Sequence, residues 1–233
     1  MPIGIIAALS AEARSLSARP INLNQLTELE HGDLLWQCGM GAERARQAAR
    51  SLLDAGATAL LSWGTAGGLD PALRPGDVVL PVTVVPSAGV GLAVDAAWHM
   101  RLCRCLAGYN INTGLLIQSP RVMAEPADKA ELFQNTGAVA VDMESAAIAQ
   151  VCNDSNKPFM VVRAIADPAG RSIPAAVVKA MDVNGRVSLS ALGLAAIGRP
   201  QLLTALLQLH KDSRAAYATL SRIARLTGTG MAR

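Results

Sequence analysis

The sequence predicts an α/β fold in which helices cover a mainly central sheet. Short apolar runs with strand character alternate with helix-like segments between Ile3 and Gly170. Most of these runs are apolar on both faces, as is typical of strands that helices cover on both sides. With 233 residues, the chain suits one large domain better than two. The expected strands are Ile3–Leu9, Leu34–Cys38, Ala57–Trp63, Val78–Val84, Val139–Val141 and Phe159–Ile165.

Helix patterns fill the intervals between the expected strands. Residues 42–55 carry Arg and Glu on one side and Ala and Leu on the other, and Gly56 follows as a C-terminal stop. Similar patterns cover Ala96–Leu106, Ala127–Gln134 and Glu144–Val151. After Gly170 there is little strand signal.

The last part of the chain differs in charge from the rest. Residues 199–233 contain six Lys or Arg and one Asp, so they carry +5 while the remaining 198 residues carry −2. We expect residues 1–198 to form the main part of one domain and residues 199–233 to form its basic, helical extension. Within it, Gln201–Leu226 reads as one long or two short helices. Its basic face is either an ordinary solvated surface or a contact for anionic lipid or an acidic partner.

Composition excludes several classes of protein. A hydrophobic content of 51% with 17% charged residues excludes a disordered chain. An aromatic content of 3% argues against binding single-stranded nucleic acid on stacked rings, so we expect no nucleic-acid partner. The longest uncharged stretch, Val78–Val94, is broken by proline and glycine and predicts no membrane span. The start of the chain does not fit a signal peptide, and the four scattered cysteines predict reduced thiols without metal, as in a cytoplasmic protein.

Four segments place acidic or glycine residues at the ends of expected strands. The loop WGTAGGLDP suits close approach of the backbone to a ligand, although a tight turn needs the same glycines. An acid at a helix start favours the helix dipole, and an Asp before Pro also forms turns. The acids concerned are Glu12, Asp142, Glu144 and Asp167.

The arrangement of these segments is more informative than any one of them. Strand ends on one edge of an α/β sheet are where such folds bind ligands, so we expect the acids and the glycine loop to converge there. Three carboxylates around one pocket suit cleavage of a glycosidic bond. One carboxylate can stabilise a cation-like sugar, and a protonated carboxyl can give its proton to the leaving base.

In these segments the sequence resembles the nucleoside phosphorylase and nucleosidase superfamily, especially its methylthioadenosine/S-adenosylhomocysteine nucleosidase branch. The matching pieces are GIIAALSAEA, CGMGAERA, GTAGGLDPALRPGDVVLP, AVAVDMESAAIAQVC and FMVVRAIADPAG. A closer resemblance, to the hopanoid-associated phosphorylases, adds TGAVAVDMES, DPAGRSIP, an NGRV turn and RPQLLTALLQL. The resemblance implies a single-domain, three-layer α/β sandwich with a mixed, partly barrel-like sheet and a helical C-terminal tail.

The resemblance also implies roles for individual residues. Asp167 matches the general acid for the purine N7, Glu144 the acid that holds the ribose hydroxyls, and Glu12 the acid that activates water. Ala166 replaces a serine that normally steadies the catalytic Asp. Val122 and Met123 replace a purine-stacking Phe and the Ile after it. The remaining expected substrate contacts are Thr65, Gly67, Gly68, Asp142 and Met143.

The nucleophile and the 5′ substituent stay open at this stage. The closer resemblance implies phosphorolysis of adenosylhopane, a pentosyl transfer with inorganic phosphate as co-substrate and no other cofactor or metal. Arg14, Arg44 and Arg46 are the candidates for holding phosphate. The alternative is a hydrolytic methylthioadenosine/S-adenosylhomocysteine nucleosidase, which Glu12 favours.

The resemblance further implies a homo-oligomer and a nucleoside substrate that can be lipid-linked. For such a substrate, Gln201–Leu226 would line an apolar channel or contact the membrane surface. A dinucleotide-binding oxidoreductase is a competing reading, but Arg44 occupies its third glycine position. The three acids argue against a non-catalytic nucleoside-binding protein.

Overall fold

One large mixed sheet forms the centre of the computed structural model, which describes residues 2–30, 32–182, 184–185, 192–193 and 199–228. Its main path runs β2-β3-β1-β4-β10-β9-β6-β7, and β11, β5 and β8 branch from β4. The long strands that carry the site are β1 (Ile3–Ala7), β4 (Ala59–Gly68), β10 (Ala140–Asp142) and β11 (Phe159–Asp167). The others are β2 (Leu26–Glu28), β3 (Leu34–Gln37), β5 (Val78–Val79), β6 (Thr83–Val85), β7 (Leu92–Ala93), β8 (Ile111–Asn112) and β9 (Leu116–Gln118).

Strand β4 connects two parts of the sheet. It pairs in parallel with β1 along Ala59–Ser62 and in parallel with β11 along nearly its whole length. Its last residues, Gly67 and Gly68, also pair antiparallel with β10, and Gly67 keeps its pairing with Asp167 of β11. Because β1, β4 and β11 run in the same direction, their carboxyl ends lie at one edge of the sheet.

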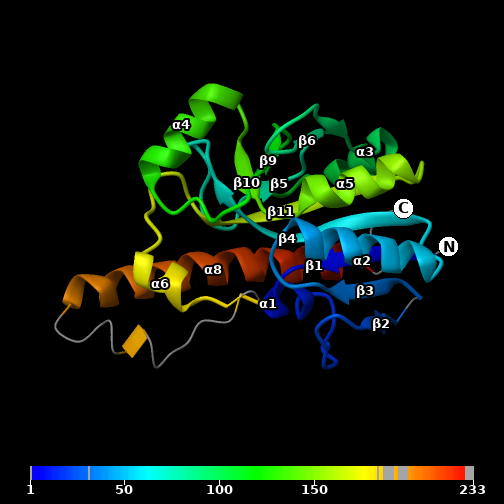
Figure 1. Cartoon of the computed structure of the whole chain (residues 1–233), viewed down its shortest axis with the longest axis horizontal. Helices are drawn as coiled ribbons and strands as arrows, with labels where there is room; N and C mark the ends of the chain where they lie inside the picture. Colours follow the sequence, from blue (N-terminus) through cyan, green and yellow to red (C-terminus); the bar gives the residue numbers. More distant parts are fainter. Residues whose placement is uncertain (1, 31, 183, 186–191, 194–198, 229–233) are drawn as a thin grey trace.

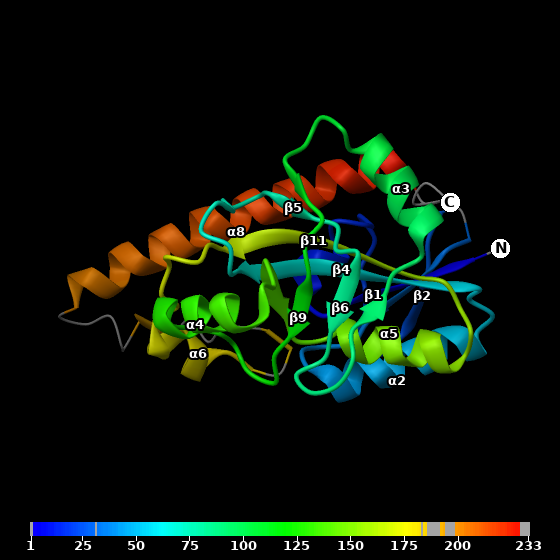
Figure 2. The ribbon, with the colours of Figure 1, turned by 90° about the horizontal axis from the view of Figure 1, so that it is seen from above.

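Helices cover both faces of the sheet, as the apolar strands predict (Figures 1 and 2). On one face α2 (Ala42–Asp54) packs on β1 and on α5 (Ser145–Asp154), and α5 packs on β4. On the other face α8 (Pro200–Thr227) lies along β11 and contacts α1 (Ser10–Ala13) and α3 (Ala96–Cys105). The remaining helices are α4 (Pro126–Thr136) and α6 (Ala175–Ala180). The predicted α/β class with a mixed sheet is confirmed.

The C-terminal tail forms one long helix rather than two short ones. Ala216, Leu220 and Ile223 of α8 are fully buried and belong to the main hydrophobic core. The other end of α8 projects beyond the sheet (Figure 2), and Leu203 and Leu207 are exposed there. The predicted boundary after residue 198 and the NGRV turn fall partly outside the described residues. Within the described part of the chain, no helix has both the length and the apolar character needed to cross a bilayer.

Most expected strands and helices are present, with two kinds of difference. The expected strand Val78–Val84 is two short strands, β5 and β6, separated by Leu80-Pro81-Val82, and Pro81 cannot donate to a strand ladder. The short elements β2, β7, β8, β9, α1 and α6 were not expected, because segments of two to six residues carry too little periodicity to be recognised.

Candidate functional site

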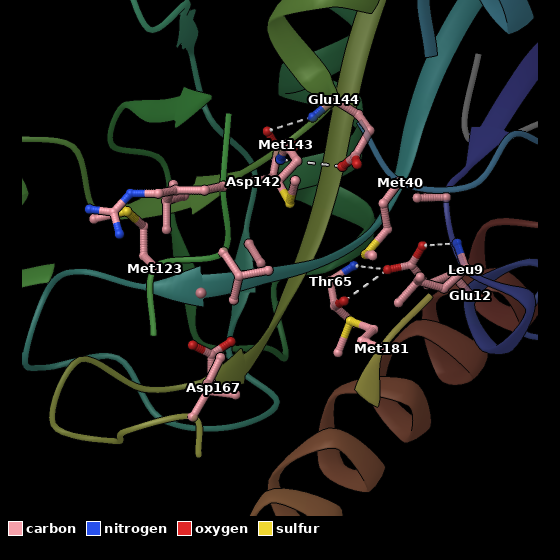
Figure 3. A pocket seen from close by; sticks show the side chains of 17 residues that line it. Leu9, Glu12, Met40, Thr65, Met123, Asp142, Met143, Glu144, Asp167 and Met181 are labelled. Atoms are coloured by element: carbon pink, nitrogen blue, oxygen red, sulfur yellow. Dashed lines mark hydrogen bonds between the residues drawn. The ribbon is translucent and has the colours of Figure 1, made fainter. Parts of the chain in front are cut away.

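A pocket at the carboxyl edge of the sheet brings together the three acids expected to be catalytic (Figure 3). Glu12 follows β1 and lies in α1, Glu144 follows β10 and precedes α5, and Asp167 is the last residue of β11. Thr65 and Gly67 reach the same pocket from β4. The full lining is Ala8, Leu9, Glu12, Met40, Thr65, Ala66, Gly67, Arg121, Val122, Met123, Val141, Asp142, Met143, Glu144, Asp167, Ile173 and Met181.

Glu12 is buried and held by three hydrogen bonds. Its Oε1 accepts hydrogen bonds from the backbone N and the Oγ1 of Thr65, both at 2.8 Å, and its Oε2 accepts one from the backbone N of Leu9 at 2.9 Å. Burial raises the pKa of Glu12, and the nearby charge of Arg163 and these hydrogen bonds oppose that shift. A carboxyl with a raised pKa in a fixed position suits a general base that takes a proton from a bound nucleophile.

Glu144 is fixed by the backbone of a distant loop. The amide of Gly41 donates a hydrogen bond of 2.7 Å to Glu144 Oε1. Gly41 has a φ of 106°, in the left-handed region that a glycine adopts without strain. Burial and then the neighbouring charge of Asp142 raise the pKa of Glu144 to about 8. The second oxygen, Oε2, accepts a long 3.3 Å hydrogen bond from the amide of Met143.

Asp167 forms an ion pair with a buried lysine, Lys129. Lys129 Nζ donates a hydrogen bond of 2.6 Å to Asp167 Oδ2, and the ammonium group is fully buried. Burial raises the pKa of Asp167 to about 6, although the charge of Lys129 opposes the shift. Gly67 lets the carboxylate approach closely, because a Cβ on Gly67 would lie 3.2 Å from Asp167 Oδ2. A carboxyl that titrates near neutral pH suits a general acid.

Asp142 lines the pocket, but its carboxylate is occupied by a buried ion pair. Arg163 donates to Asp142 Oδ2 from Nε at 2.9 Å and from Nη2 at 2.7 Å. Ser145 Oγ also donates to Oδ2, and Nη2 of Arg163 further bonds the hydroxyls of Ser62 and Ser145. We therefore assign the carboxylate of Asp142 to holding β10, β11 and α5 together, whereas the sequence had placed it among the substrate contacts.

The structure places the other expected site residues in two groups. Val122, Met123, Met143, Thr65 and Gly67 line the pocket with the three acids. Gly68, Arg14, Arg44 and Arg46 do not. Gly68 packs beneath the end of β11, where a Cβ would lie 3.4 Å from Ile165 and Pro168.

The arginines expected to hold phosphate do not line the pocket. Arg14 is exposed and forms the C-terminal cap of α1. Arg44 donates a long 3.4 Å hydrogen bond to Asn184, and Arg46 pairs with Glu43 along α2. The side chains of Arg14 and Arg44 therefore lie outside the pocket lining.

The structure adds residues that the sequence analysis did not identify. Lys129 lies on a helix that reads as an ordinary amphipathic segment, so nothing in its pattern indicates a buried ammonium. Arg163 lies in the segment VVRAIAD. An arginine inside such an apolar strand indicates a buried ion pair, so this residue did carry a signal in the sequence. Met40 and Met181 join the pocket from segments far apart in the sequence. Among the described residues, no cluster of three His, Cys, Asp or Glu side chains could hold a metal ion.

Comparisons with known proteins identify the family and relatives of the chain. The profile of the Phosphorylase superfamily matches residues 2–197. The 5′-methylthioadenosine/S-adenosylhomocysteine nucleosidase of Tolumonas auensis is 30% identical over 220 residues, which cover 81% of this chain and 95% of the relative.

Two solved structures show the same fold at lower identity. One is the nucleosidase of the same name from Neisseria meningitidis in complex with methylthio-immucillin-A, with a TM-score of 0.71 and 21% identity over 97% of this chain and 98% of that one. The other is futalosine hydrolase of Helicobacter pylori, with a TM-score of 0.68 and 16% identity over 96% and 97% of the two chains.

Proposed function

Because the chain belongs to the Phosphorylase superfamily, we propose that it cleaves the N-glycosidic bond of a 5′-substituted adenosine, with water as the nucleophile. The observation that carries this proposal is the convergence of Glu12, Glu144 and Asp167 on one pocket. The similarity to a nucleosidase for 5′-methylthioadenosine and S-adenosylhomocysteine supports the same substrate class.

Each acid has a separate role in the proposed reaction. The bond between the sugar C1′ and the purine N9 breaks, and its electron pair goes to the base. Asp167 gives a proton to N7, so that adenine leaves as a neutral molecule. Glu144 accepts hydrogen bonds from the ribose hydroxyls, and its ionised form stabilises the positive charge that develops on the sugar. Glu12 takes a proton from the water that attacks C1′.

The charges around Glu12 favour water over phosphate as the nucleophile. Among the described residues that line the pocket, the one Lys or Arg is Arg121, which is mostly exposed and pairs with Asp128. Arg163 lies near Glu12, but its guanidinium donates to Asp142, Ser62 and Ser145. A phosphate beside Glu12 would therefore meet a carboxylate without a free guanidinium to balance its charge.

The test measures adenine release from 5′-methylthioadenosine by the wild-type protein and by D167N. Asn is nearly the same size as Asp but cannot give up a proton at neutral pH, so we expect release to fall by about 10²–10⁴-fold. Thermal melts of both proteins control for folding. An unchanged rate in a folded D167N protein would refute the proposed role of Asp167.

A second candidate cleaves the same N-glycosidic bond with a different nucleophile and a different substrate: phosphorolysis of a lipid-linked adenosine such as adenosylhopane. The apolar side chains of Leu9, Met40 and Met181 support it. They surround the Glu12 end of the pocket, away from Asp167 (Figure 3). Unbranched methionine side chains adapt to large apolar groups. This candidate predicts that adenine release depends on phosphate and is faster for a 5′-alkyl adenosine with a long chain than for methylthioadenosine.

The exposed end of α8 would serve such a substrate by contacting a membrane. Leu203 and Leu207 are exposed one turn apart, and Arg199, Lys211 and Arg214 add positive charge to the same half of the chain's tail. Co-sedimentation with anionic liposomes tests this contact. We expect binding by the wild-type protein and its loss in L203Q/L207Q, and equal binding by the two would contradict it. A homo-oligomer stays a prediction that size-exclusion chromatography tests.

A further inference from the structure

The buried side chain of helix α4 is a lysine. All residues of α4 (Pro126–Thr136) are described, and Lys129 is the one that is fully buried. Lysine is seldom buried in this way, because an ammonium group loses its hydration unless other groups replace it. The hydrogen-bond partners of Lys129 therefore indicate the role of its buried ammonium group.

Four oxygens from the last residue of β11 and the turn that follows it surround the ammonium group. The shortest contact is the 2.6 Å bond to Asp167 Oδ2. The backbone carbonyls of Pro168 and Arg171 accept hydrogen bonds at 3.1 and 3.2 Å, and the carbonyl of Asp167 itself lies at 3.5 Å. Lys129 thus ties the turn that follows β11 to the carboxylate at its tip.

The two members of this ion pair differ in their access to the pocket. The side chain of Asp167 is 14% exposed and lines the pocket, whereas that of Lys129 is 0% exposed and lies behind it. Within the described part of the chain, Asp167 Oδ1 has no hydrogen-bond partner, so this oxygen is available to a ligand while Oδ2 is held. The residue before Asp167 is Ala166, which offers no hydroxyl to steady the carboxylate.

Other charges near this pair come from α8 and the turn after β11. Asp212 of α8 raises the pKa of Asp167, and it forms an ion pair with Arg171 at 3.1 Å. Asp128, next to Lys129, is paired with Arg121 at the surface. Of these groups, Lys129 is the cation that contacts Asp167 directly.

We propose that Lys129 is a positioning residue for base release, which holds Asp167 by Oδ2 so that Oδ1 faces the purine and which balances the carboxylate charge. The inference rests on the proposed function, because it takes Asp167 as the group that protonates the base. Lys129 acts through Asp167, since substrate cannot reach its ammonium group.

The test compares wild-type protein with K129M, in which a side chain of similar length lacks the charge. We expect kcat for adenine release to fall by about 10–100-fold with a small change in KM, because the acid loses its fixed position. The charge of Lys129 lowers the pKa of Asp167, so its removal raises that pKa. Since Asp167 acts in its protonated form, the fall of activity at alkaline pH moves to higher pH in K129M. K157M, which changes an exposed lysine, is the matched control and keeps wild-type behaviour.

A double-mutant cycle separates this role from a general loss of structure. In a D167N background, K129M has nothing left to position and leaves the residual rate unchanged. Additive effects of the two substitutions, or a pH profile of K129M that matches the wild type, would overturn the inference. Melting curves identify a variant that fails to fold, and K129R then provides a second variant that keeps the charge and the wild-type pH profile. Full activity of D167N would instead refute the proposed function.

Discussion

Gly64 and Glu12 lie so close that no side chain fits between them. A Cβ built on Gly64 would lie 2.7 Å from the carboxyl carbon of Glu12 and 2.7 and 2.8 Å from its oxygens. The carboxylate of Glu12 therefore packs directly against the backbone of Gly64. The glycine loop predicted from the sequence leaves the space that this carboxylate occupies.

The G64A substitution tests this contact. The added methyl group would push the carboxylate of Glu12 out of its hydrogen bonds with Thr65. We expect adenine release to fall by about 10²-fold, the typical cost of displacing a catalytic group by about 1 Å. G108A is the matched control, since a Cβ there meets nothing within 4 Å. Wild-type activity of G64A would show that the position of Glu12 is unimportant.

The E12Q substitution removes the proposed general base without changing its size. The carboxylate accepts three hydrogen bonds, and a Gln amide nitrogen cannot accept one of them. We expect hydrolysis to fall by about 10²–10⁴-fold, measured as adenine release at saturating substrate. Binding of adenine, measured by calorimetry, checks that the pocket persists. A hydrolysis rate within a few-fold of wild type would exclude Glu12 as the base.

The D142N substitution measures the structural role of the buried ion pair. Loss of the carboxylate charge leaves Arg163 buried without its partner, which costs about 3–5 kcal/mol in the free energy of unfolding. D128N is the matched control, because its pair with Arg121 is exposed and contributes about 0–1 kcal/mol. Urea denaturation of both variants gives the comparison. Equal stability losses would contradict the assignment of Asp142 as a structural residue.

The raised pKa of Glu144 predicts that stability falls as pH rises. The folded protein keeps a proton on Glu144 up to about pH 8, whereas the unfolded chain loses it near the ordinary value of 4.5. Between these values the folded state binds more protons, so each pH unit upward costs up to about 1.4 kcal/mol.

Asp167 contributes to the same slope, but only below about pH 6. Burial also raises the pKa of Glu12, which adds a slope of the same sign, so the comparison with E144Q isolates the part that belongs to Glu144. Thermal melts between about pH 6 and 8 should show a decline in the wild-type protein and a shallower one in E144Q. Parallel curves for the two proteins would contradict the assignment.

The sequence predicted the parts of the fold and site that depend on local patterns. Apolar runs in the sequence predicted the strands β1, β3, β4 and β11. The sequence motifs shared with the family predicted that Glu12, Glu144 and Asp167 lie in one site. The ion pair between Lys129 and Asp167 could not be predicted, because it depends on how α4 docks against the end of β11. The arginines were chosen by charge type alone, and the sequence does not show which of them lies in the pocket lining; the structure places Arg14 and Arg44 outside it.

The measurement that tests the central claim most directly is adenine release from methylthioadenosine with and without inorganic phosphate. A 5′-alkyl adenosine with a long chain is measured in parallel. We expect release to proceed at the same rate without phosphate, to yield free sugar and to fall in E12Q. Release that stops when phosphate is removed and yields a sugar phosphate would contradict hydrolysis and make this protein a phosphorylase.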